Sequence, residues 1–366
     1  MKVTPGKVIC VDELMSQWEG KEFKYDPTGC PHMTKMPKKP VSVGMECKCS
    51  CDAESGIMLF LELQEGKKEM ALKHYRAPPH SIQSHTAITM RCVEHWFHTH
   101  RIVVGDSAFA SVQTCKHLLR YGMHFIGVVK HATRGFPKAI FNAWEATKPH
   151  KGETRVMMAK VDIDGEEHPL LALDWKSGKT CKRIISTCSN GGKSVRDFVV
   201  ERTRVIRIDD TLGVEHYEKV IEQPNVAALM FSGFSAVDVH DHYRQGTLEL
   251  ERHYKTESWW HRLLCTILGI TYTDSYFAYC HDYEGAPRGN KKMLSYREFL
   301  QSVAIDMIKN HFRHSPPATN TRTSDIHHAR VEIEKKQVLN CNKQSNVFLI
   351  FSMFIRIMTC AESLWF

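Results

Sequence analysis

The sequence lacks several features that would place the chain among exported, membrane-spanning or zinc-knuckle proteins. Charged residues such as Lys2, Lys7 and Asp12 interrupt every early apolar run, so no secretory signal peptide is recognisable. The apolar run at residues 347–359 is shorter than the roughly 20 residues that a membrane-spanning helix needs. No two cysteines have the C-x-x-C spacing of a zinc knuckle, and no internal repeat is visible. We therefore expect an intracellular globular protein with no membrane partner.

The composition supports that expectation and adds a preference for polyanions. The 366 residues are 42% hydrophobic and 25% charged, which is enough for one large domain or two. The chain has 49 Lys and Arg against 41 Asp and Glu, and the resulting formal charge of +8 favours partners such as nucleic acid. The 13 cysteines are interpreted as reduced thiols. Cys47, Cys49 and Cys51 alternate along one predicted strand, where they fit either a metal site or, as we favour, small buried residues.

Apolar periodicity predicts an α/β layer in the first third of the chain. Two short apolar runs each end on an acid, Asp12 and Asp106. The second is followed by a helical pattern that Gly122 stops, and then by another apolar run, which is typical of a right-handed crossover between parallel strands. Ligands gather at the carboxyl ends of such strands. Strands are predicted over residues 7–11, 41–51, 57–63, 101–105 and 125–129, and helices over 82–98 and 107–122.

The pattern changes twice further along. Between residues 130 and 223, prolines separate short β-like runs, which indicates an inserted β-rich segment. Residues 259–279 form a long apolar stretch, which we interpret as a buried core helix because Arg262 and Asp274 lie within it. Residues 347–359 are predicted to be a peripheral helix or an aberrant tail.

A pair of acids further along the chain completes a candidate metal site with Asp12 and Asp106. Asp238 and Asp241 are three residues apart in a helical pattern, so they share one face. Three carboxylates gathered in a core repel one another unless divalent cations, which take hard oxygen ligands, neutralise them. Two Mg²⁺ ions about 4 Å apart support in-line displacement at phosphorus. The structural alternative is that an Asp at a strand end forms a turn or caps a helix.

Four motifs make the assignment of these acids more specific. They are VDELMSQWEGK, the KP-x-x-x-G stretch at residues 39–44, VVGDSAFASVQTCKHLLRYGMHFIGVVK and FSAVDVHDHYRQ. Over residues 6–312 they resemble piggyBac-type DDE transposases, in the same order. The resemblance implies a ribonuclease-H-like mixed sheet flanked by helices, with a β-rich insertion before the helix that carries the third Asp. Ser107 stands where the family often has Asn, and SAVD replaces its Gly-Gly-Val-Asp.

The resemblance also implies roles for individual residues. Asp12, Asp106 and Asp238 match the catalytic acids that bind two Mg²⁺ ions, for which Mn²⁺ can substitute, and Asp241 matches a supporting acid. Basic and aromatic residues are candidates for DNA contacts, although the structural alternative, a solvated surface, is favoured for any single Lys. These candidates are Lys38, Lys39, Lys130, Arg134, Arg244, Lys255, Trp259 and Arg262.

As implied by the family, the chain nicks transposon ends by hydrolysis, forms hairpins and inserts at TTAA sites. Its expected partner is double-stranded DNA, its expected location the nucleus, and its full-length form a homodimer. The expected domains are a first catalytic part at residues 1–135, the insertion at 136–230, a second, helical catalytic part at 231–313 and an irregular tail at 314–366.

A non-enzymatic alternative remains open. The family's N-terminal region and C-terminal zinc module are unmatched here, although His327, His328 and Cys341 lie where that module would begin. The fold would then serve as a catalytically silent DNA-binding or interaction domain, or would be a decayed fragment.

Overall fold

The computed structural model describes residues 4–37, 39–130, 133–188, 199–209, 213–285 and 292–309. It divides into two compact units, the first ending at Asp241 and the second beginning at His242. The predicted tail, together with His327, His328 and Cys341, lies outside the described residues.

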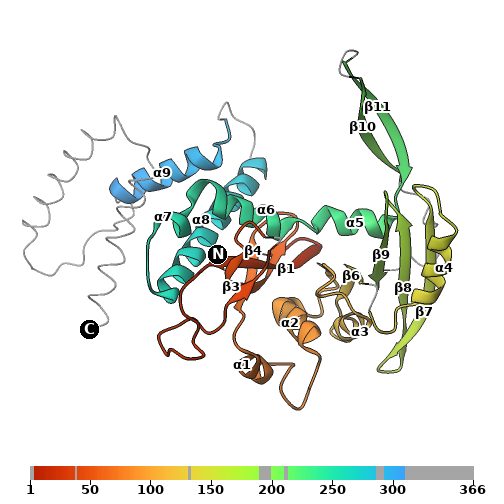
Figure 1. The fold of residues 1–366 in the computed structure, drawn as a ribbon, viewed down its shortest axis with the longest axis horizontal. Coiled ribbons are helices and arrows are strands. Elements are labelled where there is room, and N and C mark those ends of the chain that lie inside the picture. The colour runs from red at the N-terminus through yellow and green to blue at the C-terminus, as the bar shows by residue number, and fades with distance from the viewer. Residues whose placement is uncertain are drawn as a thin grey trace, which may run out of the picture. The chain divides into compact units, whose positions relative to one another are not determined.

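The first unit is built on a mixed sheet whose centre has a recognisable strand order. Strands β4, β3, β1, β5 and β6 are neighbours in that sequence; β3 is antiparallel to β1 and β4, whereas β5 and β6 are parallel to β1. This is the arrangement expected of a ribonuclease-H-like sheet, so the predicted fold class is confirmed (Figure 1). The bounds are β1 Val8–Gln17, β2 Thr34–Lys35, β3 Val43–Asp52, β4 Met58–Leu63, β5 Ile102–Gly105 and β6 His124–Val128.

Helices cover both faces of this sheet. On one face, α2 (Ser84–Val93) and α3 (Val112–Arg120) bury a large apolar cluster that includes Val11, Val103 and Phe125. On the other face, α5 (Asn225–Gly233) packs Ala227 and Met230 against Val104 and neighbouring strand residues. Burial of this kind contributes about 25 cal/mol per Å² of apolar surface. The central strands are therefore fixed from both sides, as a ligand site at their ends requires.

The two ends of α3 show how local sequence determines where this helix begins and ends. The Ser111 hydroxyl accepts a hydrogen bond from the Thr114 amide at 3.0 Å and caps the helix start. Gly122 ends it with a φ of 63°, a conformation that glycine adopts readily. The predicted stop at Gly122 is thus confirmed, and it returns the chain to β6.

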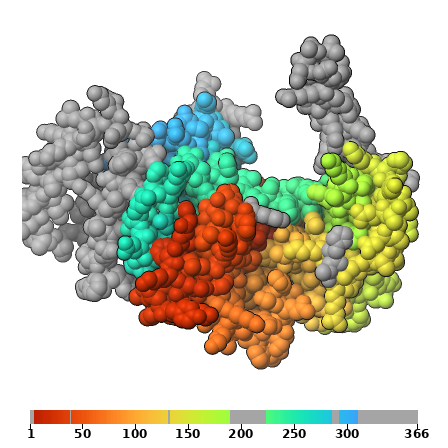
Figure 2. Space-filling model, in the orientation of Figure 1, coloured from red at the N-terminus to blue at the C-terminus, as the bar shows by residue number. Residues whose placement is uncertain are grey.

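The segment after β6 extends the sheet. Strand β9 (Cys181–Ser186) pairs antiparallel with β6, and β8 (Glu166–Lys176) and β7 (Thr154–Ile163) follow outward. A helix that the sequence pattern did not predict, α4 (Lys138–Ala146), precedes β7. Strands β10 (Val199–Asp209) and β11 (Gly213–Glu222) form a separate two-stranded ribbon. In the space-filling view the strands and helices up to β9 form one continuous surface (Figure 2).

The second unit is helical. Helix α8 (Trp259–Gly285) packs with α7 (Leu250–His253), α9 (Tyr296–Lys309) and a π-helical turn, η2 (Arg244–Leu248), around buried Leu250, Cys265 and Tyr296. The helix predicted over residues 259–279 exists, but Trp260 and Ile267 are exposed on it. None of the helices within the described ranges is both long and apolar enough to cross a membrane. Two short helical elements remain, α1 (Lys67–Leu72) and η1 (Glu94–Trp96).

Candidate active site

Parallel pairing of β1 and β5 brings two of the predicted acids together. Val11 pairs with Gly105, so the next residues, Asp12 and Asp106, follow the paired segment on neighbouring strands. Strand β1 does not end at Asp12 but continues to Gln17, paired with β3 alone. Asp12 therefore lies just beyond the end of β5, where β1 is paired with β3 alone.

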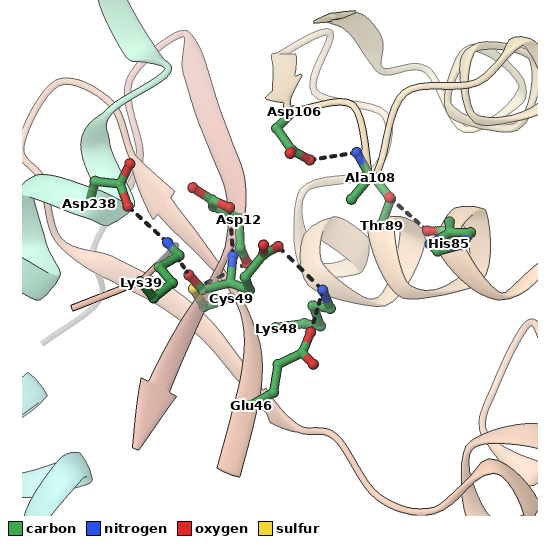
Figure 3. A network of polar contacts seen from close by, with 11 residues as sticks. Asp12, Lys39, Glu46, Lys48, Cys49, His85, Thr89, Asp106, Ala108 and Asp238 are labelled. Atoms are coloured by element: carbon green, nitrogen blue, oxygen red, sulfur yellow. Dashed lines mark hydrogen bonds and ion pairs between the residues drawn. The ribbon is translucent and has the colours of Figure 1, made fainter. Parts of the chain in front are cut away.

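The third acid comes from helix α6 (Ala236–Tyr243), which begins beside β1. The Cys10 thiol donates a hydrogen bond to the Phe234 carbonyl oxygen at 3.4 Å, which ties the start of this helix to the strand. Asp238, in the first turn, is directed toward Asp12 and Lys39, whereas Asp241 is buried (Figure 3). Asp12 lies between Asp238 and Asp106 in this view, with each acid on a different element (Figure 3).

A lysine ammonium lies among these acids. Lys39 Nζ is 2.9 Å from Asp238 Oδ1 and donates to the Glu13 carbonyl oxygen at 3.0 Å. Burial alone would lower the pKa of Lys39, but the charges of Asp12 and Asp238 outweigh it and raise that pKa. Lys39 was expected to contact DNA, and its engagement with the acids was not anticipated, although the KP-x-x-x-G motif had marked the position.

The Asp12 carboxyl is electrostatically crowded. Burial, followed by the neighbouring charge of Glu13, raises its pKa from the usual 3.8 to about 7, and Asp238 adds to the rise while Lys39 opposes it. One carboxylate oxygen also accepts the Glu13 amide at 2.8 Å. The site therefore concentrates negative charge where water is partly excluded, which is the condition that a cation relieves.

Asp106 has a local role as well. Its Oδ1 accepts the Ala108 amide at 2.7 Å, and its carbonyl oxygen accepts the amides of Phe109 and Ala110. These contacts form the turn between β5 and α3, so the structural alternative of a turn-forming aspartate applies here. The helix consequently begins at Val112 rather than at residue 107.

The donor set suits a hard divalent cation, because Asp12, Asp106 and Asp238 supply carboxylate oxygens from three segments of the chain. In the conformation described, however, the oxygens of Asp12, Asp106 and Asp238 do not form a compact group. Within the part of the chain that is described, the one set of three candidate ligand atoms all within 4.8 Å of one another is Glu145, Asp174 and Cys181. To hold an ion jointly, the three predicted acids would need to come closer together, and the Lys39 ammonium would need to leave Asp238.

The Glu145, Asp174 and Cys181 cluster is centred on a guanidinium. Arg183 Nε is 3.2 Å from Asp174 Oδ2, and its Nη2 is 3.1 Å from Glu145 Oε2 and 2.8 Å from Asn142 Oδ1. Asp174 and Arg183 are cross-strand partners on β8 and β9. Sequence reasoning missed this network, because only the strand pairing brings its members together.

The predicted DNA-contacting residues have varied environments. Lys130, Arg134 and Lys255 are exposed, whereas Trp259 and Arg262 are partly exposed. Burial lowers the pKa of Arg262. Arg244 differs from the expectation: it is 3% exposed, is ion-paired with Glu251 and lies against Gly269, so it does not present its charge to solvent. Lys38 lies outside the described residues.

The three alternating cysteines are packed in the core. Cys47, Cys49 and Cys51 are each 0% exposed, and burial raises the pKa of Cys49 well above its usual value. Cys49 Sγ donates to the Asp12 carbonyl oxygen at 3.4 Å. Their burial agrees with the favoured interpretation of small buried residues, and Cys49 lies against the Asp12 backbone.

Comparisons with known proteins bear on the family and the fold of this chain. A family model of DDE transposases, described as Transposase IS4, matches residues 1–276. Among solved structures, the chain is similar to a piggyBac transposase in a cryo-EM synaptic complex with hairpin DNA, with a TM-score of 0.58 and 17% identity. That match covers 88% of this chain and 60% of the transposase chain, so this chain spans less than two thirds of it. No curated protein matches. The likeness confirms the fold, and the family match agrees with the resemblance carried by the motifs.

Proposed function

Because this chain belongs to the DDE transposase family described as Transposase IS4, we propose that it cuts and rejoins DNA through Asp12, Asp106 and Asp238. The observation that carries the proposal is that the parallel pairing of β1 with β5 puts Asp12 and Asp106 after paired residues of adjacent strands, while Asp238 of α6 is directed toward Asp12. Asp241, buried on the same helix, supports the position of Asp238.

In this proposal the three acids hold two Mg²⁺ ions, with Mn²⁺ as a substitute. When bound, such ions activate an attacking water or 3′-hydroxyl and stabilise the leaving oxygen. The chain contributes geometry: β1 and β5 fix Asp12 and Asp106 relative to each other, and burial keeps competing water away from Asp12. Nearby exposed cations, such as Lys130 and Arg134, would fix the DNA backbone without reading its sequence.

The finer features are proposed from the family alone. They are hydrolytic nicking at transposon ends, hairpin formation, TTAA target sites, assembly of the full-length protein as a homodimer, and action in the nucleus. The predicted domain boundaries at residues 135, 230 and 313 belong here too. The competing proposal is a catalytically silent DNA-binding derivative, and the observation that favours it is that the oxygens of Asp12, Asp106 and Asp238 do not form a compact group.

A cleavage assay separates the two. Labelled DNA carrying a TTAA-flanked transposon end is incubated with Mg²⁺ or Mn²⁺ and either the native chain or Asp106→Asn. We expect nicked product from the native chain and none from the variant. Equal activity in both would refute the assigned acids. DNA binding without cleavage by either chain would favour the silent derivative.

A further inference from the structure

The cation already present in the site is the most informative feature of the acid cluster. The Lys39 ammonium contacts one carboxylate oxygen, from Asp238, and one backbone carbonyl oxygen, from Glu13. These are the ligand types that Mg²⁺ and Mn²⁺ take in proteins. Asp12 is close enough for its charge to raise the pKa of the ammonium. Lys39 thus lies where a divalent ion bound to Asp12 and Asp238 would also lie.

The setting of Lys39 allows it to leave. Its backbone is held in a short loop, where the Lys39 amide donates to the Met36 carbonyl oxygen at 3.1 Å and the Met36 amide donates to that of Ser42 at 2.7 Å. The ammonium is carried on a flexible four-carbon stem. The Lys39 side chain is 19% exposed and its partner Asp238 is 57% exposed, so the ion pair lies at the solvent edge. Neither the fold nor the loop needs to open for the ammonium to move.

We propose that Lys39 is an exchangeable counter-cation: it neutralises Asp12 and Asp238 in the metal-free protein and is displaced when a divalent ion binds. The displaced ammonium, still held by the same loop but released from its carboxylate partner, binds a phosphate of the incoming DNA. Lys39 is therefore a positioning residue that couples metal loading to substrate binding. This inference rests on the proposed function, because it needs the acids to form the metal site.

The test uses two measurements that should change in opposite directions. Mn²⁺ binding to the complete chain is followed by electron paramagnetic resonance, with no DNA present. We expect Lys39→Met to bind Mn²⁺ about fivefold to tenfold more tightly than the native chain, because no ammonium competes. DNA binding is then measured by fluorescence anisotropy in Ca²⁺. Here we expect Lys39→Met to bind at least threefold more weakly.

The controls distinguish the loss of the Lys39 ammonium from a general loss of positive charge and from unfolding. Lys160→Met removes an exposed lysine paired with Glu167 on the β7–β8 ribbon and should change neither measurement. Lys39→Arg keeps the charge and should bind Mn²⁺ no more tightly than the native chain. Asp12→Asn should bind Mn²⁺ weakly, which assigns the measured site. Thermal melts establish that each variant is folded.

The outcomes distinguish the inference from the proposed function. Equal or weaker Mn²⁺ binding by Lys39→Met, with normal binding by the native chain, would overturn the counter-cation role and leave the active site intact. Tighter Mn²⁺ binding with unchanged DNA affinity would overturn the coupling to substrate. If neither protein binds Mn²⁺, the metal site itself fails and the inference fails with it.

Discussion

Two acidic clusters in the first unit invite comparison, because the tighter one is not the candidate active site. Glu145, Asp174 and Cys181 meet the distances of a metal site, yet Arg183 lies among them. Asp12 and Asp238 are more loosely arranged and share Lys39. Arginine stays charged and forms several directed hydrogen bonds, whereas the lysine ammonium is a single mobile charge. The type and exposure of the internal cation therefore separate a permanent ion-pair network from a site that can accept metal.

The largest expected effect is on the rate of DNA cleavage. Asp238→Asn is expected to lower DNA cleavage by about 10³-fold or more, because the ions it helps to hold supply several kcal/mol of transition-state stabilisation. Its melting temperature should stay near that of the native chain, since Asp238 is exposed. The rate is measured with Mg²⁺ on labelled transposon-end DNA. A variant that retains more than a tenth of the native rate would remove Asp238 from the site.

The Arg183 network should matter for stability instead. Arg183→Met leaves Asp174, which is 0% exposed, without its cation, so the free energy of unfolding should fall by about 3–5 kcal/mol. Urea denaturation monitored by circular dichroism measures this change. The matched control is Lys160→Met, an exposed ion pair whose loss should cost about 1 kcal/mol or less. Similar losses for both variants would contradict the distinction between the clusters.

At the candidate active site, removal of a charged group should raise the stability of the protein rather than lower it. Asp12→Asn removes a crowded carboxylate, so without divalent cations at pH 8 it should raise the melting temperature by a few degrees, or about 1 kcal/mol. Excess Mg²⁺ should stabilise the native chain more than the variant. Differential scanning fluorimetry in EDTA and in Mg²⁺ provides both values. A destabilised variant in EDTA would show that Asp12 is not held under electrostatic strain.

The smallest effect is expected at Cys181. Because Arg183 neutralises its neighbours, Cys181→Ala should leave the zinc and manganese content of the purified protein unchanged. Its stability should change by about 1 kcal/mol, as for the loss of a small, partly buried group. Plasma mass spectrometry of native and variant protein checks the metal content. Stoichiometric zinc that disappears in Cys181→Ala would make this cluster a true metal site.

Local sequence signals were sufficient for the strands and turns of the central layer. The apolar runs at residues 101–105 and 125–129 predicted the parallel pair of β5 and β6, and Gly122 predicted the end of α3. The apolar pattern predicted the wrong strand end where polar residues lie inside a strand. Asp12 and Glu13 marked the expected end of the first strand, but β1 continues to Gln17 because β3 pairs with it throughout.

Contacts between segments that are distant along the chain could not be predicted from the sequence. The pairing of β9 with β6, and hence the Asp174–Arg183 network, depends on which sheet edge is free. The position of Lys39 likewise depends on the loop between β2 and β3 bringing its side chain to α6. The acids could be nominated from motifs, whereas the cation that neutralises them required the fold.

The outward addition of β9, β8 and β7 also affects how the chain avoids self-association. Without these strands, β6 would offer a short apolar border with unpaired amides, which is a template for intermolecular β-pairing. The addition instead makes β7 the outermost strand, and its exposed charged side chains, including Arg155 and Lys160, discourage a second chain from pairing there. The strands added beyond β6 therefore protect the catalytic layer from aggregation, whatever else they do.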